Sequence, residues 1–164
     1  MFTIRPYRPD DYKQVWELYR QGNRATGTDA GNGPWNDDMR HIEKTYLNGY
    51  GAFLVGIIGD KIIAMGALRK TNGNRAELKR MRVDQAYLRQ GFGQAILNSL
   101  ESHAKELNYS ELHLDTTFQQ KKAQKAGYHV TYQEASKVEK PDLKNITDPK
   151  LFGNCDGRLG DDTA

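Results

Sequence analysis

The sequence has few of the features that cross-link a chain covalently or anchor it in a membrane. Its 164 residues include a single cysteine, Cys155, so an internal disulfide is excluded and a reducing compartment is the natural setting. No apolar run approaches the roughly 18 residues needed to cross a bilayer. Residues 1–5 also lack the apolar stretch of a secretory signal. We therefore expect a cytoplasmic protein with no membrane partner.

A large excess of charge of one sign is also missing. The 24 Lys and Arg residues face 21 Asp and Glu residues, for a formal net charge of +3, which does not by itself favour nucleic acid. The basic strip from Arg69 to Arg82 has few interleaved aromatic residues. We interpret it as a solvated sheet edge or a phosphate rim and expect no nucleic-acid partner. No Cys, His and Asp residues cluster at metal-ligand spacing, so no metal is expected.

Length and pattern indicate one compact domain followed by a polar tail. A chain of 164 residues, 37% of them hydrophobic, is long enough to bury a core without disulfides. The expected domain covers residues 1–135. Residues 136–164 are rich in Lys, Asp and Pro and show little periodicity, so we expect a loosely ordered tail.

Hydrophobic periodicity predicts a mixture of strands and helices. Strands are expected at residues 2–5, 52–58, 61–68, 76–83, 111–116 and 128–134. Helices are expected from residue 12, at 37–47, from about 92 to 107 and at 119–125, with a loop at 22–35. Between Leu78 and Met81 the apolar positions change parity, which predicts a β-bulge. The alternative is an exposed mixed strand without a bulge.

The segment with the clearest chemistry is a strand, a glycine-rich turn and a helix. Gly91 and Gly93 let the backbone approach a ligand closely, because no Cβ is in the way. The free amides and the dipole of the following helix favour an anion such as a pyrophosphate, and Arg89 adds a positive charge at the rim. Ile96 stands where a dinucleotide fingerprint would place its third glycine, and no Gly-Lys-Ser/Thr ending is present. Rossmann and P-loop sites are therefore excluded.

The segment MRVDQAYLRQGFGQAIL, residues 81–97, resembles the coenzyme A motif of the GNAT acetyltransferase superfamily. The family pattern is Gln/Arg-x-x-Gly-x-Gly/Ala between the fourth strand and the third helix, and the expected order of elements matches from Phe2 to about Tyr132. The resemblance implies an α/β (α+β) GNAT acyl-CoA-transferase fold. Its central mixed sheet is mostly antiparallel, contains a splayed parallel pair and is flanked by helices. The parity break falls where the family has its bulge.

The resemblance also implies an activity and a cofactor site. The expected activity is that of an acetyl-CoA-dependent N-acetyltransferase, which moves the acetyl group directly to a primary amine of a small molecule or a protein. The pantetheine arm is expected on the backbone of Met81, Arg82 and Val83. The pyrophosphate is expected on the turn amides of Arg89, Gln90, Gly91, Phe92, Gly93 and Gln94. Dimers are frequent in the family, so a homodimer stays open.

The chain departs from the family pattern in two places. The first motif position, usually Gln or Arg, is Leu88, with Arg89 beside it. Many members carry on the fourth helix a Tyr that protonates the leaving thiolate, but here the helix looks shortened and that position is missing. Tyr128 matches an aromatic packing position instead, so no general acid is named. The shortened helix and the missing Tyr are the best support for the alternative to an active enzyme, a non-catalytic acyl-CoA-binding or interaction module on the same fold.

Glu77 is the candidate general base. Amine acetylation needs a neutral nucleophile, and several family members place a catalytic Glu at the start of the bulged strand. The alternative is a solvated charge opposite Arg75 or Lys79. The backbone amide of Met81 is the candidate donor to the oxyanion. The histidines at positions 41, 103, 113 and 129 share no motif spacing and are expected on the surface or in strands.

The acceptor is expected to enter by the loop at about residues 22–38, as the resemblance implies. Trp35, Asp37 and Asp38 are the candidate acceptor-binding residues, because an aromatic face and two carboxylates can receive a cation. The alternative is that Asp37 caps the second helix while Trp35 packs at its base. The sequence does not identify the amine.

Overall fold

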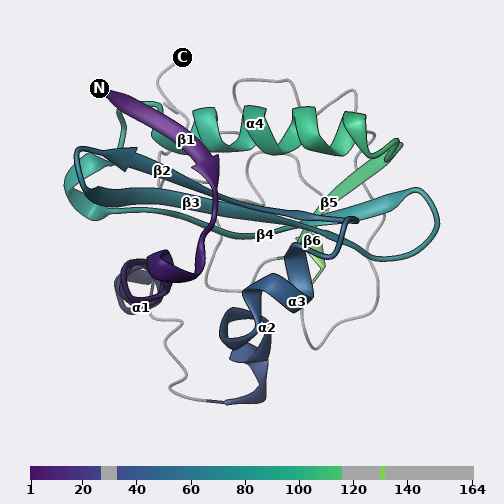
Figure 1. Ribbon diagram of the computed structural model, residues 1–164, viewed down its shortest axis with the longest axis horizontal. Helices are drawn as coiled ribbons and strands as arrows, with labels where there is room; N and C mark the ends of the chain where they lie inside the picture. The colour runs from purple at the N-terminus through teal and green to yellow at the C-terminus, as the bar shows by residue number, and fades with distance from the viewer. Residues whose placement is uncertain (27–32, 116–129, 132–164) are drawn as a thin grey trace.

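The computed structural model describes residues 1–26, 33–115 and 130–131, which build a twisted sheet between two helical layers (Figure 1). The strands are β1 (Phe2–Pro6), β2 (Ala52–Ile58), β3 (Lys61–Lys70), β4 (Arg75–Val83), β5 (Glu111–Asp115) and β6 (Val130–Thr131). The helices are α1 (Tyr12–Thr26), α2 (Asp37–Arg40), α3 (Ile42–Tyr46) and α4 (Phe92–Glu106), with 3₁₀ turns η1 (Pro9–Asp11), η2 (Pro34–Asn36) and η3 (Gln85–Tyr87). The described strands lie in the order β1 to β6, as they do in the chain.

The sheet is mixed. Strands β1 to β4 pair antiparallel, whereas β4 pairs parallel with β5 and β5 pairs parallel with β6. The β2–β3 hairpin turns at Gly59, whose φ of 60° lies in the left-handed region that glycine tolerates best. Residues 62–68 of β3 are buried without alternation because helices cover both faces of the sheet. The predicted fold class, with its mostly antiparallel sheet and its parallel pair, is confirmed.

Each face of the sheet has its own apolar core. Helix α4 covers one face, and α1, α2 and α3 cover the other (Figure 1). The α4 side chains in the first core are Ile96, Leu97, Leu100 and Ala104. The second core takes Val15, Leu18 and Tyr19 from α1, Met39 from α2, and Ile42 and Tyr46 from α3. The side chains of β4 therefore face two different environments.

The predicted bulge in β4 is present. The β3–β4 register pairs Ala67 with Lys79 and Met65 with Arg82, so Gly66 alone faces Arg80 and Met81. Because of the extra residue, Lys79 and Arg80 both lie on the α1–α3 face, whereas Met81 packs into the α4 core.

Apart from shifts of one or two residues at strand ends, two helices differ from the sequence prediction. Helix α1 continues to Thr26, so the loop predicted at 22–35 was wrong over residues 22–26. A Cβ on Gly22 would overlap the side chain of Arg82, and glycine there lets the helix pass close to β4. The helix predicted at 37–47 divides into α2 and α3, because His41 leaves helical geometry with φ −130° and ψ 50°. The predicted helix at 119–125, the strand at 128–134 apart from 130–131, and the tail at 136–164 lie outside the described residues.

Candidate functional site

Among the described residues, the pairing of β4 with β5 ends before β4 does. Their parallel pairing runs from Arg75 opposite Glu111 to Leu78 opposite Leu114, while β4 itself continues to Val83. The bulge therefore lies just beyond the last β4–β5 pair. Beyond Leu78, β4 has no pairing with the described part of β5, and backbone groups at such a strand edge can pair with an extended ligand.

The turn after β4 is held in place at both ends. At its start, Asp84 accepts a hydrogen bond from the Ala86 amide at 2.9 Å and pairs with Lys61 at 2.7 Å. At its end, Gly91 is the N-cap of α4 and has a φ of 88°. Arg89 also has a positive φ, 62°, and its side chain is exposed. The predicted glycine turn thus leads into the amino-terminal end of a 15-residue helix, where free amides favour an anion.

Aromatic packing fixes the angle at which α4 leaves this turn. The ring of Phe92 lies 4.5 Å from that of Phe2 and 6.2 Å from that of Tyr87, measured between ring centroids. Gly93 is buried in the first helical turn. Leu88 packs against the α4 core, so the departure from the family motif replaces a polar side chain by an apolar contact.

The three residues expected to hold a pantetheine arm alternate between the two faces. Met81 and Val83 are buried against α4, whereas Arg82 points toward α1. Its guanidinium donates hydrogen bonds to the Met81 carbonyl at 2.7 Å and to Asn23 Oδ1 at 2.6 Å. Burial lowers the pKa of Arg82 to about 10, so the side chain remains charged at neutral pH.

Glu77 lies at the last part of β4 that still pairs with β5. Its side chain is 5% exposed, and its carboxylate pairs with Arg69 at 2.8 Å and with Lys79 at 3.5 Å. Burial alone would raise its pKa, but the two cations more than offset that, and the pKa lies below its usual range. Glu77 is therefore an ionised, buried group rather than the solvated charge considered as the alternative.

The acceptor-side candidates lie on η2 and α2, across the α1–α3 face from Glu77. Asp38 is paired with Arg80, through Nε to Oδ2 at 2.8 Å and Nη2 to Oδ1 at 2.5 Å, and it also accepts a hydrogen bond from Tyr46. Burial would raise the pKa of Asp38, but the hydrogen bonds and charge of Arg80 hold it below its usual range. Burial and the Asp38 charge raise the pKa of Tyr46, which stays protonated.

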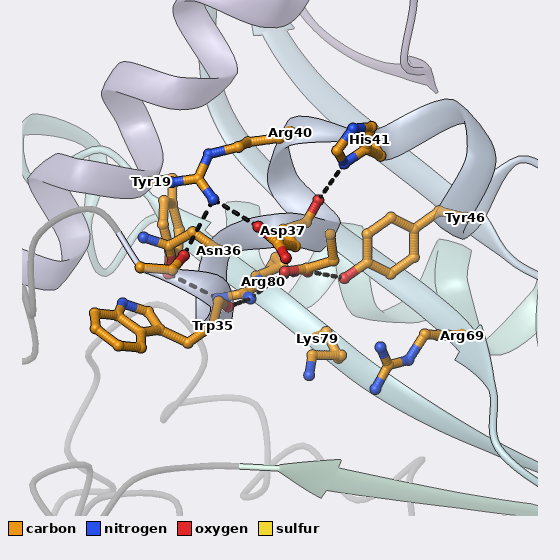
Figure 2. Close-up of polar contacts among 12 residues, drawn as sticks. Tyr19, Trp35, Asn36, Asp37, Arg40, His41, Tyr46, Arg69, Lys79 and Arg80 are labelled. Carbon is orange, nitrogen blue, oxygen red and sulfur yellow. Dashed lines mark hydrogen bonds and ion pairs between the residues drawn. The ribbon is translucent and has the colours of Figure 1, made fainter.

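Asp37 and Trp35 have simpler surroundings. Asp37 pairs with Arg40 at 2.6 Å on the surface, and no side-chain cap is formed at the start of α2. The side chain of Trp35 is exposed, while its carbonyl accepts a hydrogen bond from Arg80 at 2.9 Å. Figure 2 shows Arg80 inside this group, with Lys79 and Arg69 to one side of it.

Four residues that organise this side were not predicted from the sequence. Asp38 is bound by Arg80 and Tyr46, and Glu77 is paired with Arg69. The hydroxyl of Tyr19 accepts a hydrogen bond from Arg80. Only Arg80 carried a signal, because it stands at the parity break of β4. In the described part of the chain, no group of three or more His, Cys, Asp or Glu side chains could hold a metal ion. Within those same residues, no helix combines the length and apolar character of a membrane span.

The sequence matches one protein family, and the fold resembles several solved structures. A family model described as Acetyltransferase (GNAT) family matches residues 12–126. A GNAT-family acetyltransferase from Staphylococcus aureus superposes with a TM-score of 0.70 at 24% identity, over 76% of this chain and 79% of that one. An acetyltransferase from Streptococcus agalactiae gives 0.71 at 19% identity, over 82% and 88%. The PaiA N-acetyltransferase from Thermoplasma acidophilum, in complex with coenzyme A, gives 0.59 at 19% identity, over 73% and 81%. A search of curated protein sequences finds no match.

Proposed function

The chain belongs to the GNAT acetyltransferase family, and we propose that it transfers the acetyl group of acetyl-CoA directly to a primary amine. The amine belongs to a small molecule or a protein. The observation that carries the proposal is the bulged end of β4, which lies beyond its described pairing with β5 and leads into the glycine turn and the start of α4. The complex of PaiA N-acetyltransferase with coenzyme A, a neighbour in fold, supports the same cofactor.

The proposed cofactor site is made mainly of backbone. Met81, Arg82 and Val83 would pair with the pantetheine arm through the backbone of β4 beyond its described pairing with β5. The amides from Arg89 to Gln94 would hold the pyrophosphate, since the first amides of a helix that begins after Gly91 have no partner within the helix and favour an anion. When bound, acetyl-CoA supplies an acetyl thioester. The Met81 amide would donate a hydrogen bond to the negative charge that develops on the carbonyl oxygen.

Glu77 is the proposed base for the acceptor amine. An ammonium has no lone pair, so its proton must leave before the nitrogen can attack, directly to the carboxylate or through a water. Glu77 is ionised at neutral pH because Arg69 and Lys79 stabilise its charge. The same stabilisation makes it a weaker base than a carboxylate in an apolar pocket. We therefore expect a contribution near the lower end of general-base catalysis.

The proposed acceptor side is formed by Trp35, Asp37 and Asp38, with the exposed indole of Trp35 as the surface that an incoming amine meets. Asp38 and Asp37 each already hold an arginine. An acceptor would thus meet a pre-formed network of paired charges rather than a bare carboxylate.

The first test is calorimetric titration with acetyl-CoA and with CoA alone, followed by a screen of amines with thiol release as the readout. Micromolar binding and release of free thiol by at least one amine are expected. Absence of acetyl-CoA binding by the wild-type protein would refute the proposal.

The ion pairs around Glu77 also favour a second candidate, a non-catalytic acyl-CoA-binding module, since they weaken the only base proposed here. Binding of acetyl-CoA without thiol release by any amine in the screen would favour this second function. Turnover that Glu77→Gln removes while binding persists would exclude it.

A further inference from the structure

Arg80 belongs to both sides of the proposed site. Its backbone is the extra residue of the bulge in β4, with a φ of 58°. A residue with a side chain is disfavoured in this left-handed conformation, so other contacts must hold it there.

Those contacts come from the side chain, which joins β4 to α1 and to the adjacent elements η2 and α2. The guanidinium donates to Tyr19 Oη of α1 at 2.7 Å, to the Trp35 carbonyl of η2 at 2.9 Å, and to both carboxylate oxygens of Asp38 in α2. Tyr19 in turn donates to Asn36 at 2.6 Å. Figure 2 shows Tyr19 and Tyr46 on opposite sides of the group that surrounds Arg80. One side chain therefore fixes η2 and α2 relative to the bulge.

This ion pair differs from an ordinary surface pair. The side chains of Arg80 and Asp38 are 13% and 10% exposed, whereas those of the neighbouring pair, Arg40 and Asp37, are 34% and 64% exposed. Burial would lower the pKa of Arg80, but the hydrogen bonds and charge of Asp38 raise it above its usual range. A bidentate, mostly buried pair of this kind is rigid and stays charged at neutral pH.

We propose that Arg80 is a positioning residue that couples the cofactor strand to the acceptor side. Its backbone shapes the bulge beside the thioester, while its side chain holds the segment 34–38 that the acceptor meets. This inference rests on the proposed function for the identity of the two ligands. The consequence is that binding of acetyl-CoA along β4 also steadies α2, although α2 contributes no backbone to the cofactor strand.

The test is backbone hydrogen exchange over residues 35–46, with and without saturating acetyl-CoA. The variants are Arg80→Gly, which accepts the left-handed backbone but loses every side-chain contact, and Arg40→Gln as the control at the exposed pair. In the wild type, acetyl-CoA should slow exchange in this segment severalfold. In Arg80→Gly, exchange without ligand should be about tenfold faster, and acetyl-CoA should bind yet leave it unchanged. Arg40→Gln should behave as the wild type.

A second pair of variants isolates the backbone role. Arg80→Ala loses the same contacts as Arg80→Gly but retains the penalty of the left-handed backbone. Because this backbone is left-handed without any ligand, the penalty should appear in folding, and the ratio of folded to unfolded Arg80→Ala should be about fivefold lower than that of Arg80→Gly in urea unfolding. If Arg80→Gly does not fold, Arg80→Lys takes its place, because lysine keeps the charge without the bidentate geometry. Faster exchange is expected there too.

The inference is overturned if residues 35–46 exchange at the wild-type rate in a folded Arg80 variant. It is equally overturned if acetyl-CoA slows their exchange as much in Arg80→Gly as in the wild type. Failure of the wild type to bind acetyl-CoA would instead remove the proposed function. The comparison of ligand-free exchange rates would still test the structural tie.

Discussion

The two sides of the proposed site are built by different means. The cofactor side, from the bulge of β4 through Gly91 to the start of α4, relies on backbone groups and on a short continuous stretch of chain. The acceptor side relies on side chains from α1, η2, α2 and β4, which meet only in the folded protein. A site made of backbone groups is therefore disrupted by any side chain added within it. A network of side chains is instead disrupted by a change in the chemistry of one of its members.

The largest expected effect is on the cofactor side. Gly93→Val and Gly91→Val should each weaken the affinity for acetyl-CoA at least about a hundredfold, as measured by calorimetry. The reason is that a branched side chain would occupy the space proposed for phosphate. Gly59→Val is the matched control for backbone strain, since Gly59 also has a positive φ, 60°, but open space around its Cβ position. It should lose stability and keep its affinity. Normal binding by Gly93→Val would mean that the site lies elsewhere.

The next largest expected effect is on kcat and concerns Glu77, at the boundary between the two sides. Glu77→Gln should lower kcat about a hundredfold, near the lower end for loss of a general base, with acetyl-CoA affinity unchanged. Glu111→Gln is the control, because Glu111 pairs with Arg75 at 2.7 Å on the adjacent strand and has no proposed catalytic role. Steady-state kinetics with the best amine from the screen would measure both. An unaltered kcat in Glu77→Gln would assign the proton to another group.

On the acceptor side, two neighbouring carboxylates allow a direct comparison of buried and exposed ion pairs. Asp38→Asn should lower the free energy of unfolding by about 2–3 kcal/mol, because it leaves the mostly buried Arg80 with a neutral partner. Asp37→Asn, at the exposed pair with Arg40, should change it by no more than about 0.5 kcal/mol. Urea unfolding would measure both values. Equal effects would show that burial of the Arg80 pair does not matter.

The smallest effect is the pH dependence of the Asp38 contribution. The pKa of Asp38 is lowered in the folded protein, so its stabilisation is fully present above the ordinary carboxyl pKa and is lost as the pH falls through the lower, folded value. The difference in unfolding free energy between wild type and Asp38→Asn should therefore be constant from about pH 7 to 5 and shrink below about pH 4. A difference that grew on acidification would contradict this assignment.

The same contrast explains how much the sequence could predict. The strands, α4, the glycine turn and the bulge were predictable because each depends on local periodicity or on residues close in the chain, such as Leu78 and Met81. The extension of α1 past Gly22 was not, because it depends on the side chain of Arg82 on a distant strand. Likewise, the partners of Asp38 come from other elements, Arg80 from β4 and Tyr46 from α3, and no spacing in the sequence relates Arg80 to Asp38.

Gly22 in α1 has a consequence for the order of folding. Glycine weakens a helix by roughly 1 kcal/mol relative to alanine, and here it precedes the last turn of α1, against which Arg82 packs. The first part of the helix can form early through local contacts of Val15 and Tyr19, but residues 23–26 gain their support only when β4 is in place. We expect this last turn to become protected after the sheet in a pulse-labelling experiment during refolding, and Gly22→Ala to be destabilising despite the higher helix propensity of alanine.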